Sequence, residues 1–118
     1  MNSRGTTAIE FAILAPVLLA FLLGITEFGR AFWIRQTLQF AVEEAARAAL
    51  VNSALSASDI SNLVTADLTG LQNVTPAITV TNSATQIGVS ASAPFTFIVP
   101  NLLPFGPFTL TASCTFPR

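Results

Sequence analysis

The longest uninterrupted hydrophobic segment lies near the start of the chain, from Phe11 to Ile25. As an α-helix this segment is about 22 Å long, shorter than the roughly 30 Å hydrocarbon core of a bilayer. Extending it from Thr6 to Thr26 gives about 31 Å, which is enough to span a bilayer, but the extended segment contains Glu10. A membrane span over 6–26 therefore requires neutralisation of Glu10, because an unpaired carboxylate in lipid costs on the order of a few kcal/mol.

From residue 27 to residue 51 the pattern stays helical but becomes amphipathic. Glu43 and Arg47 form an i,i+4 pair on one side of the helix. No proline or glycine interrupts residues 31–51, so we predict one continuous helix from about Thr6 to about residue 51, roughly 65 to 70 Å long. The side opposite the charged pair carries apolar residues at alternating steps of three and four, which are Ala31, Ile34, Leu38, Ala41, Ala45 and Ala48.

The apolar half of this helix has features suited to packing against other helices. Small residues recur at four-residue spacings and allow close approach of a neighbouring helix. Pro16 lacks an N–H donor and disturbs the carbonyl of the residue four positions earlier, so we expect a kink or a local loosening there. The candidate packing residues are Ala8, Phe11, Ala12, Pro16, Ala20 and Gly24.

A short second helix is predicted over Ala57–Leu68, with Ser58 or Ser56 as its N-cap and Asp59 near the positive end of its dipole. Gly70 is expected to stop it. Beyond this helix the hydrophobic period changes to about two, which is typical of strands rich in β-branched and aromatic residues. The predicted strands are "AITVT", "TQIGVSASA", "FTFIV" and "FTLTASCTF".

The last strand has the clearest alternation, with threonine and serine on one face and Phe108, Leu110, Ala112, Cys114 and Phe116 on the other. A turn at "TNSATQ" and a proline-rich loop at "VPNLLPFGP" would connect antiparallel neighbours. Such a sheet has too little core of its own. We therefore predict an α+β fold in which a small antiparallel meander covers the outer half of the long helix.

Composition argues against several classes of function. Only 9% of the 118 residues are charged and the net charge is −1, so the chain has no basic surface for nucleic acid. It has no histidine, and Cys114 is its only cysteine; we therefore predict no metal site and no cofactor. Asp59 and Asp67 are the only carboxylates beyond the long helix, without a nucleophile or base beside them, so no enzymatic activity is expected. Cys114 is expected to act as a small buried hydrophobe, with an intersubunit disulfide as the alternative.

Glu10 acquires a partner if the chain is cut between Gly5 and Thr6. The new amino terminus then belongs to Thr6, and Glu10 becomes the fifth residue of the mature helix. The ammonium and the carboxylate, of one chain or of neighbouring chains, can pair inside the apolar layer. Two alternatives for this end of the chain are a cleaved secretory signal, which Glu10 and the lack of an A-x-A site disfavour, and an ordinary uncleaved anchor.

The segment "RGTTAIEFAILAPVLLAFLLGITEFGRAFWIRQTLQFAVEEAARAA" resembles the TadE-like pseudopilins of the tight-adherence (Tad) pilus system, which are relatives of type IV pilins. The resemblance covers roughly residues 4 to 48, and the closing "LTASCTFPR" is also similar to family C-termini. It implies that Gly5 ends a leader removed by a prepilin peptidase, that Thr6 is the first mature residue, and that Glu10 is the carboxylate needed for assembly. Glu27 and Arg30 match the family's exit motif; alternatively they are an exposed pair worth a few tenths of a kcal/mol at the membrane interface.

The resemblance implies four segments: a leader (1–5), a transmembrane helix half (6–26), an amphipathic helix half (27–51) and an extracytoplasmic α+β head (52–118). The expected protein is a minor pseudopilin, a structural subunit that crosses the bacterial cytoplasmic membrane once, with its N-terminus inside, and is incorporated in a cell-surface pilus. Its expected partners are other pilin subunits, self or heterologous, the prepilin peptidase, the inner-membrane assembly platform and the lipid bilayer. The alternatives are a major filament-forming pilin and a non-assembling, membrane-anchored binding module.

Overall fold

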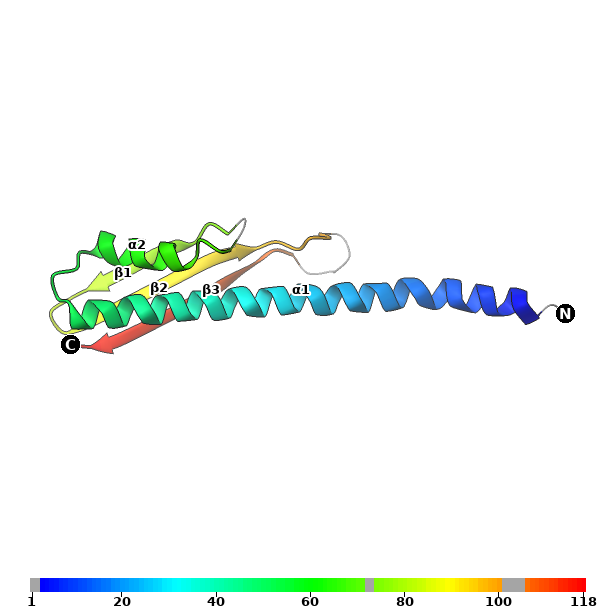
Figure 1. Cartoon of the computed structure of the whole chain (residues 1–118), viewed down its shortest axis with the longest axis horizontal. Coiled ribbons are helices and arrows are strands. Elements are labelled where there is room, and N and C mark those ends of the chain that lie inside the picture. Colours follow the sequence, from blue (N-terminus) through cyan, green and yellow to red (C-terminus); the bar gives the residue numbers. More distant parts are fainter. Residues whose placement is uncertain (1–2, 72–73, 101–105) are drawn as a thin grey trace.

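The computed structural model describes residues 3–71, 74–100 and 106–118. The molecule is elongated, with extents of 81 × 22 × 20 Å, and one long helix runs along its full length (Figure 1). A small head packs on the carboxyl-terminal half of that helix. The elements in chain order are α1 (Ser3–Val51), α2 (Ala57–Asp67), β1 (Ala77–Asn82), β2 (Gln86–Phe95) and β3 (Phe108–Pro117). The predicted α+β fold is therefore confirmed.

Helix α1 is continuous, as predicted, and begins at Ser3, slightly before the expected Thr6. Pro16 lies inside it. In the apolar half, the hydroxyls of Thr7 and Thr26 donate to the carbonyls of Ser3 and Leu22, at 3.0 and 2.9 Å. These bonds within the helix satisfy the hydroxyl donors, which lowers the cost of placing threonine in an apolar environment.

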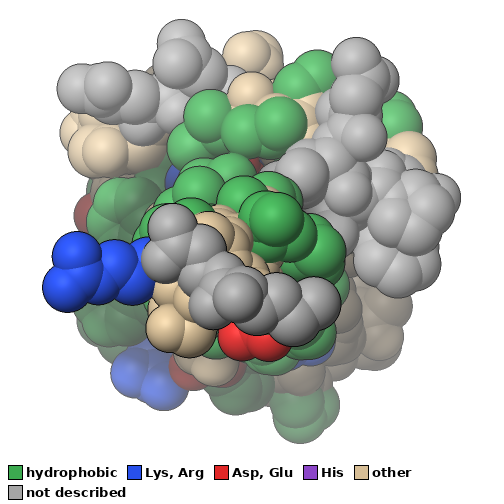
Figure 2. Space-filling view, turned by 90° about the vertical axis from the view of Figure 1, so that its right-hand side faces the viewer, with side chains coloured by type: hydrophobic (Ala, Val, Ile, Leu, Met, Phe, Trp, Pro, Cys, Tyr) green, Lys and Arg blue, Asp and Glu red, His purple; other side chains and the backbone are tan. Residues whose placement is uncertain are grey.

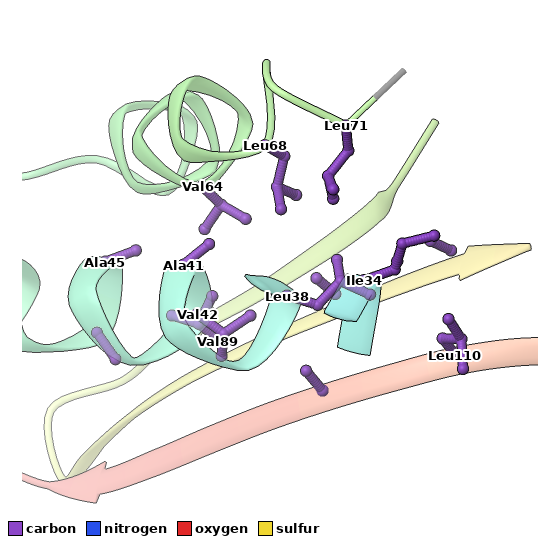
Figure 3. Packing of buried hydrophobic residues seen from close by; sticks show 14 of the residues in the cluster. Ile34, Leu38, Ala41, Val42, Ala45, Val64, Leu68, Leu71, Val89 and Leu110 are labelled. Atoms are coloured by element: carbon purple, nitrogen blue, oxygen red, sulfur yellow. The ribbon is translucent and has the colours of Figure 1, made fainter. Parts of the chain in front are cut away.

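The buried stripe of α1 is wider than the sequence pattern indicated. Ala48 is only half-buried, although the other predicted members are buried. The stripe broadens because α2 and the sheet approach α1 from different sides, and both contact it. Figure 3 shows Val64 of α2 on one side of α1, near Ala41 and Ala45, and Val89 of the sheet on another side of the same helix. The buried residues that the pattern missed are Val42, Ala46 and Ala49.

Helix α2 begins with a capping box, which selects Ser56 over Ser58 as the N-cap. The Asp59 N–H donates to Ser56 Oγ at 3.2 Å, and the Ser56 N–H donates to Asp59 Oδ2 at 3.0 Å. Hydrogen bonds from the Ser56 side chain and backbone lower the pKa of Asp59. The carboxyl end differs from the prediction: Leu68, in right-handed helical geometry, is the C-cap, and Gly70 lies beyond it in a turn.

The sheet has three antiparallel strands in the order β1-β2-β3. The predicted "TNSATQ" turn joins β1 to β2, with the Ser83 N–H donating to the Gln86 carbonyl at 3.0 Å. Arg118 is tied to the same turn, because its N–H donates to the Thr85 carbonyl at 2.9 Å and its guanidinium donates to Asn82 Oδ1 at 2.8 Å. The end of the chain therefore lies beside the tip of the head that is farthest from the start of α1 (Figure 1).

The two faces of the sheet differ in chemistry. Val89 pairs with Val80 on one side and with Cys114 on the other, and this row faces the core. The next row, Thr79, Ser90 and Ser113, faces outward. The core side of β2 and β3 is made by Ile87, Val89, Ala91, Ala93, Phe95, Leu110 and Ala112.

One predicted strand is wrong. The segment "FTFIV" does not form a separate strand, because β2 ends at Phe95 and the chain leaves the sheet at Thr96. The Thr96 carbonyl and the Ile98 N–H bond instead to side chains of α1, which satisfies polar groups that a strand would place in a ladder. Residues 101–105 of the predicted proline-rich loop lie outside the described part of the chain.

Candidate assembly helix and membrane-exit clasp

The amino-terminal half of α1 exposes its apolar side chains on all sides. Within the described chain, no residue between Ser3 and Thr26 is buried, and exposure reaches 71% at Phe11. This helix is long and apolar enough to cross a membrane. Figure 2 looks along the molecule from this end and shows hydrophobic side chains gathered around the helix. The large exposed residues are Ile9, Phe11, Ile13, Leu14, Val17, Leu18, Leu19, Phe21, Leu22, Leu23 and Ile25.

All the sequence-predicted residues of this half lie along α1 and away from the head. Gly5, Thr6, Ala8, Glu10, Phe11, Ala12 and Pro16 are exposed, and Ala20 and Gly24 are partly covered. By helical periodicity, Glu10 shares one stripe with Val17, Phe21 and Phe28. Glu10 takes part in neither of the two ion pairs found among the described residues. Its carboxylate therefore interrupts an otherwise apolar surface.

A shallow groove runs along the next turns of the same surface. A Cβ atom added at Gly24 would meet nothing within 4 Å, so the glycine leaves open space. This arrangement is one that another helix could fill closely. The groove is lined by Val17, Ala20, Phe21, Gly24, Ile25 and Phe28.

Glu27 and Arg30 form a clasp between α1 and the segment that follows β2. Arg30 Nη2 lies 2.9 Å from Glu27 Oε2, and only 5% of Glu27 is exposed. The Ile98 N–H donates to Glu27 Oε1 at 2.9 Å, and Arg30 donates to the Thr96 carbonyl. The exposed interfacial pair, which was the alternative interpretation, is therefore wrong: the pair is largely covered and holds the head.

Aromatic side chains support this clasp. The guanidinium carbon of Arg30 lies 4.4 Å from the centroid of the Phe95 ring, within range of a cation–π interaction. The Phe95 ring in turn contacts Phe97 and Phe108, with centroids 5.4 and 5.0 Å away. Arg30 thus bonds to Glu27 on its own helix and packs on a strand residue distant in sequence, which fixes the end of β2 against α1.

The sequence pattern could find the Glu27 and Arg30 pair but not its partners. The spacing of three residues on a helix indicates the ion pair itself. The Thr96 and Ile98 backbone groups lie 66 and 71 residues away along the chain, and backbone groups carry no side-chain signal.

Replacing Glu27 with glutamine is expected to destabilise the head by about 2 to 3 kcal/mol, because the charge facing Arg30 and the charged acceptor of the Ile98 N–H are both lost. The matched control is Glu43→Gln, which breaks an exposed pair with Arg47 at 3.4 Å and is expected to cost under about 0.5 kcal/mol. Urea titrations of the full chain in detergent micelles measure both values. Equal losses for the two variants would show that the clasp contributes no more than a surface ion pair.

Cys114 lies on the core side of β3 and is half-buried. Burial, and then the nearby Glu43 carboxylate, raise the pKa of its thiol, with Arg47 acting in the opposite direction. Among the described residues, no group of three or more cysteine or carboxylate side chains is arranged to hold a metal ion. The distinctive features of the described residues are the exposed apolar half of α1 and the clasp between Glu27, Arg30 and the segment after β2.

Comparison with known proteins finds a family that matches most of α1. A family model described as "TadE-like protein" matches residues 5–47, which cover the exposed half of α1, the clasp residues on α1 and most of the stripe under the head. No curated protein and no solved structure matches the chain. The expected resemblance is therefore confirmed over 5–47: this part of the chain matches the TadE-like family of Tad pilus proteins.

Proposed function

We propose that this protein is a pilin-like structural subunit, a minor pseudopilin that takes part in assembly of a Tad pilus through helix–helix packing. The observation that carries the proposal is the division of α1 into a half covered by the head and an apolar half in which, among the described residues, no side chain is buried. A bilayer first covers the apolar half, and neighbouring subunits cover it after extraction. No bond chemistry is involved, so the role is structural and non-enzymatic.

The position of Glu10 supports processing of the chain between Gly5 and Thr6. Both residues lie on the helix that starts at Ser3. After cleavage, Thr6 and Glu10 are one helical turn apart on the same face, where side chains are about 5 to 6 Å from each other. The new ammonium group of Thr6 is therefore positioned to pair with the Glu10 carboxylate of its own chain or of a neighbour, and the charge becomes compensated.

The partners and orientation of the subunit follow from the same proposal. Its partners are other pilin subunits, the prepilin peptidase, the inner-membrane assembly platform and the lipid bilayer. Residues 1–5 are the leader, 6–26 cross the cytoplasmic membrane with the N-terminus inside, and the head lies outside. The match to the TadE-like family over the helix favours a minor subunit over the alternative of a major filament-forming pilin.

The experiment that tests this function is an intact mass and N-terminal sequence of the protein recovered from its native envelope. The expected mature chain begins at Thr6, and a Gly5→Val variant, with a branched side chain at the cut, is expected to accumulate uncleaved. A native chain that still begins at Met1 would contradict the proposal, because Glu10 would then have no ammonium partner. That result would favour a simple membrane-anchored binding module.

A further inference from the structure

A second exposed apolar surface lies just beyond the apolar half of α1, where the helix meets the head. Ile98, in the segment after β2, is 70% exposed, and Val99 is 37% exposed. On α1, Phe28, Phe32 and Trp33 are 47%, 64% and 58% exposed. We call these five residues the exit collar. Five large apolar side chains are therefore exposed near the end of the apolar half of α1.

The clasp fixes the level of the collar along the helix. Because the Ile98 N–H lies 2.9 Å from Glu27 Oε1, Ile98 is held level with the residue that follows Thr26, the end of the proposed span. In Figure 1 the chain beyond β2 extends along α1 toward its amino-terminal half. Figure 2, viewed from that side, shows hydrophobic side chains beside the helix as well as on it.

Membrane dimensions identify what lies at this level. A span over 6–26 fills the hydrocarbon core, and the headgroup layer adds roughly 5 to 7 Å on each side. Counted along the helix from Thr26, Phe28 lies about 3 Å, Phe32 about 9 Å and Trp33 about 10.5 Å away. Phe28 and Ile98 therefore fall within that layer, and Phe32 and Trp33 lie just beyond it with side chains that tilt back toward the amino-terminal end of the helix. Phenylalanine, tryptophan and aliphatic residues are favoured there, because one part of each side chain can reach the acyl chains.

We propose that the exit collar is a membrane-docking surface, and that the head inserts Ile98 and Val99 into the headgroup layer of the same bilayer that α1 crosses. The occupant is the phospholipid surface, because the collar is continuous with the span and lies level with its end. The head is then held at two places, by α1 and by the collar, so its orientation on the membrane is fixed before assembly. This inference rests on the proposed membrane span.

The test uses the full chain in vesicles of phosphatidylethanolamine and phosphatidylglycerol, with a fluorophore sensitive to polarity on one introduced cysteine. Cys114 is the only native cysteine, so each variant carries Cys114→Ser. The test site is Ile98→Cys, the control within the span is Leu18→Cys, and the control at the far tip of the head is Ala84→Cys. All three native side chains are exposed, so the labels do not disturb the core.

The expected result is blue-shifted emission and strong quenching by lipids with brominated acyl chains at positions 18 and 98, several-fold stronger than at position 84. Quenching at 18 with position 98 as weak as position 84 would overturn the docking surface and leave the proposed function intact. Weak quenching at all three positions would show that α1 does not enter the bilayer, and both proposals would fail. Strong quenching at all three would show that the whole head lies on the lipid and would also overturn a specific collar.

Discussion

Substituting Glu10 with alanine is expected to reduce incorporation of this subunit into pili by roughly a hundredfold. Removing one partner of a buried ion pair costs about 3 kcal/mol or more, because the remaining charge stays buried without compensation. In the proposed assembly, that remaining charge is the ammonium group of Thr6. The free chain loses less, because in a membrane the ammonium group can reach the headgroup layer at the inner surface.

The measurement is the ratio of subunit in sheared pili to subunit in the envelope, for cells expressing the variant at the native level. Glu44→Ala is the matched control, because Glu44 is an exposed carboxylate on the same helix but lies outside the apolar half. The control is expected to incorporate normally. If Glu10→Ala also incorporated normally, the carboxylate would have no assembly role. Absence of the native chain itself from sheared pili would instead favour the anchored binding module.

Substituting Leu38 with alanine is expected to destabilise the head by about 2 to 5 kcal/mol. Leu38 is fully buried at the place where α1 meets α2 and the sheet (Figure 3). On the neighbouring turns of α1 it is flanked by Ile34, Ala41 and Val42, which are themselves buried, so the structure has little freedom to collapse around the missing atoms. For a small domain this loss is a large fraction of the total free energy of unfolding.

Phe40→Ala is the control for this second prediction, because Phe40 lies two residues further along the same helix and is 61% exposed. A change there is expected to shift the free energy of unfolding by less than about 0.5 kcal/mol. Urea titration of the full chain in detergent micelles, followed by circular dichroism, compares the two. Similar losses for both variants would show that the buried stripe of α1 does not contribute most of the stability of the head.

The sequence was sufficient for features that depend on local pattern. The continuous helix, the second helix with its serine cap, the turn between β1 and β2 and the inward face of β3 all follow from periodicity and capping chemistry. The same holds for the exposed apolar run that begins at Phe11. A helix that is apolar on every side does not have the pattern of an amphipathic surface helix.

What could not be predicted depends on contacts between distant parts of the chain. "FTFIV" has the composition of a strand, but the Glu27 and Arg30 side chains compete for its backbone groups. Val42 and Ala49 are buried because two elements approach α1 from different sides, and a single helical stripe gives no sign of the second. The level at which Ile98 lies along α1 likewise follows from a hydrogen bond to a backbone group, which no residue type reveals.

The direction of the strands has a mechanical consequence. In Figure 1 all three strands run lengthwise beside α1, and Arg118 ties the end of the chain to the turn at the far tip. A pull on that tip relative to α1 is therefore directed roughly along the strands, and it loads the packed surface between the sheet and α1 in shear. The head is built to transmit force along the axis of its own helix.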